Sequence, residues 1–136
     1  FHDPVPKTEV PAILAAADVG LMALFRSPLV HIYFENKLMD YMGAGKPIFA
    51  AMEGEQARLI REVGAGRVVG TFDDEGLANA LLEASCHPEE LGPMGVRGQE
   101  FVRRSLLLPE ILGRYAARIE ECAATRCRGA EAWVPV

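Results

Sequence analysis

The sequence is poor in cysteine and has no long hydrophobic run. It holds three cysteines, Cys86, Cys122 and Cys127, and an odd number without paired spacing argues against a disulfide framework. No other Cys or His follows at the spacing of a zinc site, so no metal is expected. No apolar run approaches the roughly 20 residues that span a bilayer. We therefore expect reduced thiols in a cytoplasmic protein without a transmembrane segment.

Basic residues are also scarce. Lys and Arg number 14 against 19 Asp and Glu, which gives a formal net charge of −5. No basic stripe or basic–aromatic interleaving occurs, so nucleic acid is not expected as a partner. The rest is ordinary globular composition, with 50% hydrophobic and 24% charged residues among 136. That length suffices for one domain with a hydrophobic core.

Short apolar segments alternate with helical patterns along the chain. The continuous apolar run of residues 18–24 predicts a strand covered on both faces. Two more strands are expected, at 48–51 and 67–70. Helices are expected from Thr8 as a capping residue, after Asn36, over 55–63, from Asp73 or Asp74 as a cap, over 87–104 and over 106–125. This alternation predicts an α/β fold with a Rossmann-like parallel sheet and flanking helices.

Residues 35–50 hold the densest set of candidate site residues. Asn36 is placed to cap a short helix that Gly45 ends in a left-handed conformation. Unpaired N–H groups at the helix start, with Lys37 beside them, suit a phosphate. Asp40, about one turn further on, suits a sugar hydroxyl. The combination suggests that this segment binds a nucleotide diphosphate.

The loop of residues 25–34 would follow the carboxyl end of a parallel strand, where α/β sheets bind their ligands. His31 and Tyr33 lie in this loop. No carboxylate and nucleophile are spaced around His31, so an ordinary loop residue is the alternative to a ligand contact. Gly54 and Glu55 follow the next strand, where a helix cap and a first-turn acid are as good an interpretation as a role in a ligand site.

The segment NKLMDYMGAGKPIFA, residues 36–50, resembles the donor-site segment of the family-4 retaining glycosyltransferases. That segment typically reads Asn/Ser-Lys-Leu-x-Glu/Asp-Tyr-x-Ala-x-Gly-x-Pro-Val/Ile. VPAILAAADVGLMAL before it, and GEQARLIREVGAGRVV and DDEGLANALLEA after it, resemble the same family in the same order. The resemblance covers roughly residues 1–120.

This resemblance implies a GT-B fold. Residues 1–126 would form its C-terminal nucleotide-sugar-binding lobe, incomplete at the N-terminus, and residues 127–136 a tail. The full enzyme would move a sugar from a nucleotide diphosphate, most often UDP, to a saccharide or lipid-linked acceptor in surface-polysaccharide assembly. It would need no metal or cofactor and could associate peripherally with a membrane. Because the acceptor lobe and a basic Arg/Lys pair are missing, the fragment alone is expected to be inactive.

The resemblance also implies roles for individual residues. Asp40 takes the place of the second acid of the Glu-x7-Glu motif, which binds ribose, and a solvated helix carboxylate is the alternative. Ile32 stands at the first acid's place, so the motif is not intact, and using Glu35 instead would need a shifted loop. Asn36 and Lys37 are interpreted as cap and phosphate-facing cation, against an ordinary cap and an exposed lysine. The candidate donor-binding residues are His31, Tyr33, Glu35, Asn36, Lys37 and Asp40.

Two other functions fit part of the pattern. The first is a degenerate, non-catalytic α/β module kept for protein contacts, which Ile32 in place of an acid favours. The second is a sugar-nucleotide epimerase of the GT-B type, whose catalytic acids would lie mostly outside this chain. The local motif fits the epimerase less well than the transferase.

Overall fold

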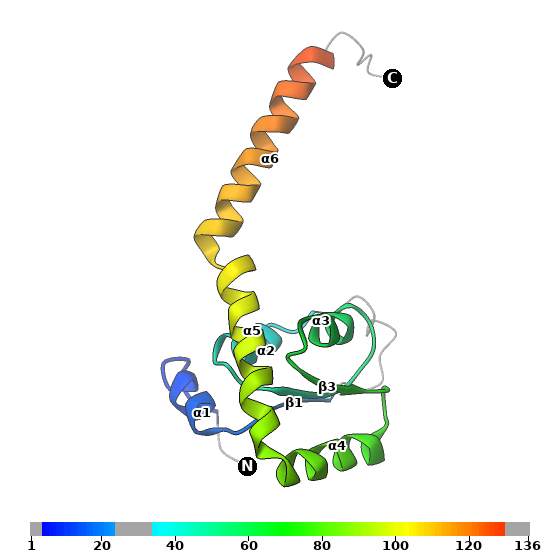
Figure 1. Cartoon of the computed structure of the whole chain (residues 1–136). Helices are drawn as coiled ribbons and strands as arrows, with labels where there is room; N and C mark the ends of the chain where they lie inside the picture. Colours follow the sequence, from blue (N-terminus) through cyan, green and yellow to red (C-terminus); the bar gives the residue numbers. More distant parts are fainter. Residues whose placement is uncertain (1–3, 24–33, 130–136) are drawn as a thin grey trace. The chain divides into compact units, whose positions relative to one another are not determined.

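The structure is a computed structural model that describes residues 4–23 and 34–129, with side chains as far as residue 125. The chain divides into two compact units, residues 1–103 and residues 104–136. The first unit is α/β, as the alternation of segments predicts. Its three strands form one parallel sheet, and helices lie on both faces of that sheet (Figure 1).

The sheet consists of β1 (Gly20–Ala23), β2 (Ile48–Ala51) and β3 (Gly66–Val69) in the order β1-β2-β3. The first residue of each strand pairs with the first residue of the next. Parallel neighbours need a crossover connection, and the crossovers carry α2 (Lys37–Gly43) and α3 (Glu55–Val63). All four residues of the central strand β2 are buried.

One face of the sheet packs against the two crossover helices. Met22 of β1 and Ile48 of β2 belong to a cluster with Leu38 and Met42 of α2 and Ile60 of α3. Each of these side chains is at most 1% exposed. In Figure 1, α2 and α3 lie over the same side of the strands. The apolar positions at helical spacing in α2 are therefore its core-facing positions.

The other face is covered by α4 (Asp74–Cys86). Phe49 of β2, which is fully buried, packs with Leu77 and Ala84 of this helix. Asp73 caps α4, because its carboxylate accepts a hydrogen bond of 2.8 Å from a backbone N–H of the first turn. The sequence predicts either Asp73 or Asp74 as the cap of this helix, and the structure shows that it is Asp73.

β1 corrects one prediction, because it is not covered on both faces. Leu21 pairs with Phe49, so the two side chains share the face on which α4 lies, yet Leu21 is 49% exposed. α4 packs on β2 and β3, while β1 is at the edge of the described sheet. The apolar run correctly predicts that these residues form a strand, but its prediction that both faces of the strand are buried is wrong. Burial of β1 depends on whether α4, which is distant in the sequence, packs against this strand.

α1 (Val10–Ala16) begins later than predicted and has no side-chain cap. Thr8 was expected to cap this helix, but the residue at the cap position is Glu9. The N–H of Glu9 donates to the carbonyl of Pro6 at 2.9 Å. This preceding turn includes Thr8, so the helix starts after it.

α5 (Leu91–Ser105) approaches the end of α2 closely. Its buried residues are Gly95 and Gly98, and Gln99 donates from Nε2 to the carbonyl of Gly43 at 3.1 Å. The sequence analysis expects glycines in this helix to weaken it. In the structure, neighbouring segments come close to both buried glycines, Gly45 to Gly95 and Ala65 to Gly98.

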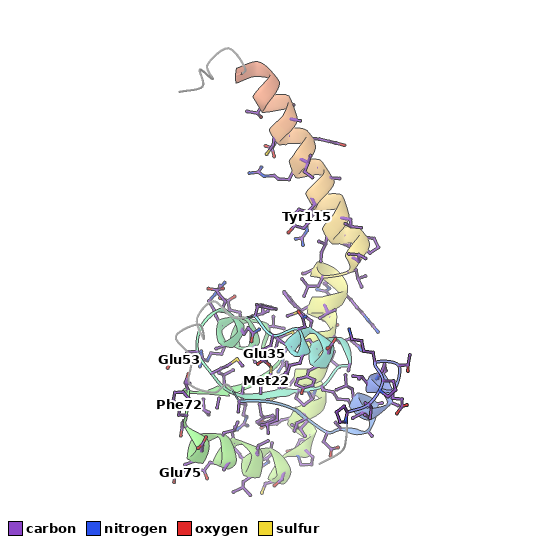
Figure 2. The ribbon with its side chains drawn as sticks, turned by 180° about the vertical axis from the view of Figure 1, so that it is seen from behind. Met22, Glu35, Glu53, Phe72, Glu75 and Tyr115 are labelled. Atoms are coloured by element: carbon purple, nitrogen blue, oxygen red, sulfur yellow. The ribbon has the colours of Figure 1, made fainter. Side chains whose placement is uncertain are left out.

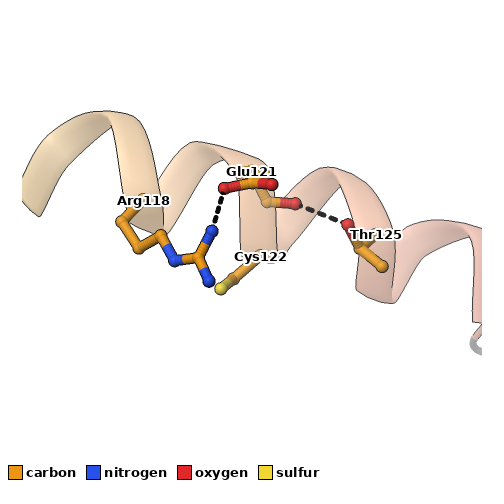
Figure 3. Close-up of a pocket in the computed structure, with 4 residues that line it drawn as sticks. All are labelled: Arg118, Glu121, Cys122 and Thr125. Atoms are coloured by element: carbon orange, nitrogen blue, oxygen red, sulfur yellow. Dashed lines mark hydrogen bonds and ion pairs between the residues drawn. The ribbon is translucent and has the colours of Figure 1, made fainter. Parts of the chain in front are cut away.

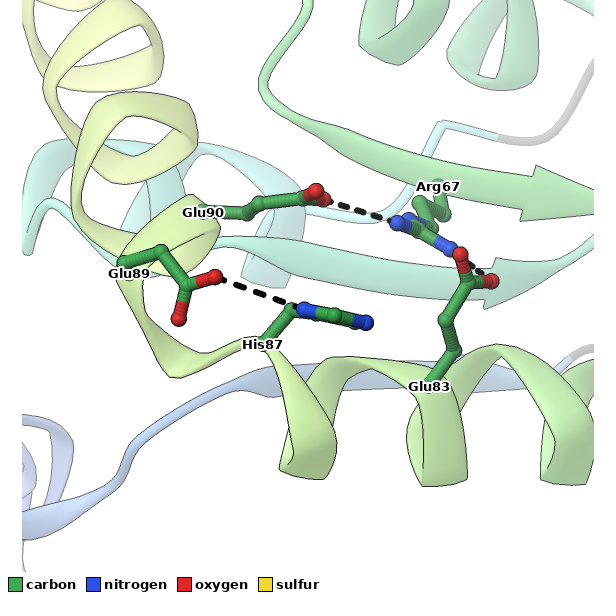
Figure 4. A network of polar contacts seen from close by, with 5 residues as sticks. All are labelled: Arg67, Glu83, His87, Glu89 and Glu90. Atoms are coloured by element: carbon green, nitrogen blue, oxygen red, sulfur yellow. Dashed lines mark hydrogen bonds and ion pairs between the residues drawn. The ribbon is translucent and has the colours of Figure 1, made fainter.

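Arg67 joins β3 to α4 and to a short 3-10 helix, η1 (Pro88–Glu90). Its guanidinium pairs with Glu83 and, at 2.8 Å, with Glu90 (Figure 4). The hydrogen bond with Glu83, followed by that with Glu90, raises the pKa of Arg67. These carboxylates are about half exposed, so we expect the network to orient the α4–α5 connection and to contribute little stability.

In its described part, the second unit is formed largely by α6 (Leu108–Gly129). Leu112, Tyr115 and Ile119 lie on one side, at the spacing that the sequence shows, and each is more than half exposed. α6 takes in residues 127–129, which the sequence analysis assigns to the tail.

Candidate functional site

The carboxyl ends of the three strands lie at the same edge of the sheet, because the strands are parallel. Glu53 follows β2 and Phe72 follows β3, and both lie at this end of the sheet in Figure 2. α2 follows β1 and α3 follows β2, so both helices begin on this side. Sheets of this kind bind ligands at this edge.

The structure describes four of the six predicted donor-binding residues, all at the start of α2. They are Glu35, Asn36, Lys37 and Asp40. The other two, together with the residue at the place of the first motif acid, lie outside the described residues: His31, Tyr33 and Ile32.

A groove of about 1010 Å³ runs between α1 and α2. Asn36 and Asp40 line it from the α2 side, and Lys7, Val10 and Leu14 line it from the side of α1. The groove thus combines apolar walls with one carboxylate and one ammonium group. A carboxylate accepts hydrogen bonds from two hydroxyls at once, and apolar walls with a few polar groups are typical of small-molecule sites.

Lys46 connects the turn after α2 with α1, the other helix that lines this groove. Its ammonium group donates to the carbonyl of Ala15 in α1 at 3.0 Å. Gly45, just before it, has φ 68° and ends α2 in the left-handed conformation that the sequence predicts. The contact agrees with the structural role expected of Lys46.

Glu35 and Lys37 are not among the residues that line the groove. The ammonium of Lys37 lies 3.0 Å from the carboxylate of Glu35, whose side chain is 12% exposed. The backbone carbonyl of Glu35 accepts a hydrogen bond of 3.4 Å from Nε2 of Gln56 in α3. Of the four described candidates, Asn36 and Asp40 therefore line the groove, whereas Glu35 and Lys37 pair with each other near α3.

The start of α2 corrects the prediction that Asn36 caps this helix. Asn36 has φ −60° and ψ −30° and makes no capping hydrogen bond. A capping side chain usually reaches back from extended backbone, so the helical backbone of Asn36 explains why the predicted cap does not form. The N–H groups of Leu38 and Met39 donate to the carbonyls of Glu35 and Asn36, at 3.2 and 2.9 Å. These two donors are therefore occupied in the structure.

α3 begins at the same edge with Gly54, whose φ is 87°, and Glu55. The carboxylate of Glu55 lies 2.6 Å from the guanidinium of Arg58. The hydrogen bond from Arg58 lowers the pKa of the Glu55 carboxyl. Since Glu55 is exposed and already paired, these contacts favour the first-turn acid over the donor-site role.

We expect the substitution Arg58→Ala to raise the pKa of the Glu55 carboxyl toward its ordinary value. A carboxyl whose pKa is lowered by folding stabilises the fold above its ordinary pKa and loses that contribution as pH falls through the lowered value. A carbonyl-detected NMR titration of Glu55 measures the shift. Arg61→Ala in the same helix is the control and should leave the Glu55 curve in place, whereas an unmoved curve in Arg58→Ala would contradict the assignment.

Two buried side-chain oxygens near the carboxyl edge have no hydrogen-bond partner in the part of the chain that is described: Oε1 of Gln56 and Oγ1 of Thr71. Gln56 lies in the first turn of α3, and Thr71 lies two residues beyond β3. Buried polar atoms are nearly always paired, so each exception calls for an explanation. Neither residue can be recognised from the sequence, because a single polar residue forms no pattern.

A second, shallow hollow lies along α6 and is lined by Arg118, Glu121, Cys122 and Thr125 (Figure 3). Arg118 pairs with Glu121, and the hydroxyl of Thr125 donates to the Glu121 carbonyl at 2.8 Å. All four residues are exposed on a single helix. Contacts of this kind are ordinary for a helix surface, and we assign no site to them.

Across residues 4–23 and 34–125, no group of three or more His, Cys, Asp or Glu side chains could hold a metal ion. None of the helices described here is both long and apolar enough to cross a membrane. Comparisons with protein-family models, with curated proteins and with solved structures find no significant match.

Proposed function

We propose that the first unit binds the nucleotide-sugar donor of a retaining glycosyltransferase. The observation that carries the proposal is the groove between α1 and α2, which holds Asn36 and Asp40 of the segment that resembles the family. It supports a ligand with vicinal hydroxyls and an apolar or planar part, as a nucleoside has. The full enzyme would transfer the sugar to a saccharide or lipid-linked acceptor.

In this proposal, Asp40 binds the ribose. Its carboxylate is exposed along the groove and accepts hydrogen bonds from the two ribose hydroxyls. Val10 and Leu14 provide an apolar wall opposite, and Lys7 adds one positive charge. We expect the nucleoside to lie along α2 between these groups.

The diphosphate would approach Lys37. That ammonium group lies 3.0 Å from Glu35, so a phosphate must compete with the Glu35 carboxylate for it. This competition predicts weak binding by this chain alone. Charge stabilisation on the leaving diphosphate and positioning of the acceptor are the usual means of catalysis in such transfers. We assign no catalytic residue in this chain and expect it to transfer nothing alone.

The test is a titration of the chain with UDP, followed by amide NMR shifts. Shifts should cluster at residues 36–44 and at Lys7 and Val10. Because a hydrogen bond to a charged group contributes about 1.5 to 3 kcal/mol, we expect Asp40→Ala to weaken binding by about tenfold or more.

Glu75→Ala is the matched control, since it removes an exposed carboxylate from α4, on the opposite face of the sheet. It should leave the dissociation constant for UDP unchanged. Shifts that cluster elsewhere, or that persist unchanged in Asp40→Ala, would contradict the proposed site. Measurable sugar transfer by the chain alone would contradict the expected inactivity.

A non-catalytic interaction module is the second candidate. It is favoured by the uncovered apolar surface at Leu21 on β1 and along Leu112, Tyr115 and Ile119 on α6. This candidate predicts that neither UDP nor other nucleotides shift the amides of the groove. The same titration therefore separates the two functions.

A further inference from the structure

Gln56 is a buried polar side chain in an otherwise apolar part of the first unit. It is 3% exposed and stands beside Ala57 and near Ile60 in α3, both fully buried. No other polar or charged side chain of the described residues is buried to this extent. An apolar residue of similar length would fill this position without the need to satisfy an amide group.

The amide of Gln56 donates a hydrogen bond to the start of α2. Nε2 donates to the backbone carbonyl of Glu35 at 3.4 Å, across 21 positions of sequence. The same carbonyl accepts the N–H of Leu38 at 3.2 Å, and the Glu35 carboxylate pairs with Lys37. Gln56 therefore contacts Glu35, whose carbonyl also accepts the first backbone hydrogen bond of α2.

The other half of the amide has no partner among the described residues. Oε1 of Gln56 is buried and accepts no hydrogen bond from that part of the chain. A buried acceptor without a donor destabilises the fold, whereas replacing both partners by apolar groups can be neutral or stabilising. Residues that break the rules of core packing are expected at functional sites.

We propose that Gln56 is a positioning residue for the nucleotide site. By holding the carbonyl of Glu35, it fixes the start of α2 and hence the placement of Lys37 and Asp40 toward the nucleotide. This inference rests on the proposed function, because it assigns Gln56 a role in that same site. Gln56 itself touches no nucleotide in this assignment.

The test is Gln56→Met, which keeps the length of the side chain and removes the amide. The midpoint of urea unfolding should stay the same or rise, because the unpaired oxygen is gone. The dissociation constant for UDP should rise by about fivefold, the value of one ordinary hydrogen bond. A role in packing alone would leave UDP affinity unchanged, and a role in stability alone would lower the urea midpoint.

A second measurement needs no ligand. In Gln56→Met, the amide signals of residues 35–38 should shift and the N–H of Leu38 should exchange faster with solvent. Gln99→Met is the matched control, because Gln99 donates to the carbonyl of Gly43 at the other end of α2. It should move the signals of residues 43–46 and leave those of 35–38 in place.

UDP binding and the amide signals of residues 35–38 test two different claims. If the unaltered chain does not bind UDP, the proposed function fails, while the amide signals still decide whether Gln56 fixes the start of α2. Unchanged signals and exchange at residues 35–38 in Gln56→Met would overturn the inference. The inference would also be overturned if Gln56→Met bound UDP as tightly as the unaltered chain does, or if its urea midpoint fell.

Discussion

Replacing Gly95 by alanine should lower the free energy of unfolding of the first unit by about 3 kcal/mol. A Cβ atom at this position would lie 2.0 Å from the carbonyl oxygen of Gly45 and 2.8 Å from its carbonyl carbon. Both are backbone atoms, so no side chain can rotate away. Gly45 itself has a positive φ and ends α2, which leaves the turn little freedom to move.

Gly92→Ala in the same helix is the control. Apart from its two chain neighbours and the backbone of its own helix, no atom lies within 4 Å of a Cβ placed there. Glycine costs about 0.5 to 1 kcal/mol relative to alanine in a helix interior. Gly92 lies in the first turn of α5 and is followed by Pro93, which disfavours helical backbone at a preceding residue with a Cβ atom. These two effects oppose each other, so this variant should change stability much less than Gly95→Ala. The two substitutions are chemically identical and should have effects of very different size.

Urea unfolding followed by far-UV circular dichroism measures both variants against the unaltered chain. With a urea slope of about 1 to 3 kcal/mol per molar, the Gly95→Ala midpoint should fall by about 1 M or more. If the two variants shifted the midpoint equally, the close approach of α5 to the turn after α2 would be contradicted. A Gly95→Ala variant that stays folded should also bind UDP more weakly, because the displaced turn ends the helix that carries Asp40.

Elements with local signals could be predicted from the sequence. α3 spans Glu55–Val63, as predicted, because an apolar stripe and a closing Gly64 mark it. Asp73 caps α4 because a carboxylate before a helical stripe acts within three residues. Signals of this kind depend on neighbours in sequence, so a single chain is enough to interpret them.

Features that depend on distant elements or on backbone angles could not be predicted in the same way. Whether Asn36 caps α2 is decided by its backbone, which is helical. Whether Leu21 is covered is decided by where α4 lies, more than 50 positions later. In the candidate site, the local pattern and the resemblance both indicate Asp40. The position of α1 across the groove and the contact from Gln56 depend on non-local packing, so no local pattern predicts them.

These non-local contacts converge on α2, a helix of seven residues. An isolated helix of that length is unstable in water, so its position depends on its neighbours. Gln56 holds its start, Gln99 and Gly95 contact its end, and Lys46 joins the following turn to α1. A short helix fixed at both ends can present Asp40 in one orientation, which a binding site for ribose requires.

The second large effect is expected from Phe49→Ala, which should cost about 3 to 5 kcal/mol of the free energy of unfolding. Phe49 is fully buried in the central strand and packs with Leu77 and Ala84 of α4. Total stabilities of single domains are about 5 to 15 kcal/mol, so the variant should be partly unfolded near its working temperature. Leu82→Ala, at a 64% exposed position of α4, is the control and should change stability by less than about 0.5 kcal/mol.

Phe49→Ala also separates stability from binding. Phe49 belongs to the cluster on the α4 face, whereas α2 packs in the cluster on the other face. At a low temperature where Phe49→Ala is folded, its dissociation constant for UDP should therefore equal that of the unaltered chain. Gly95→Ala should lose both stability and affinity, because it displaces the turn that ends α2. Equal losses of affinity in both variants would mean that binding follows overall stability, and the assignment of the site to α2 would fail.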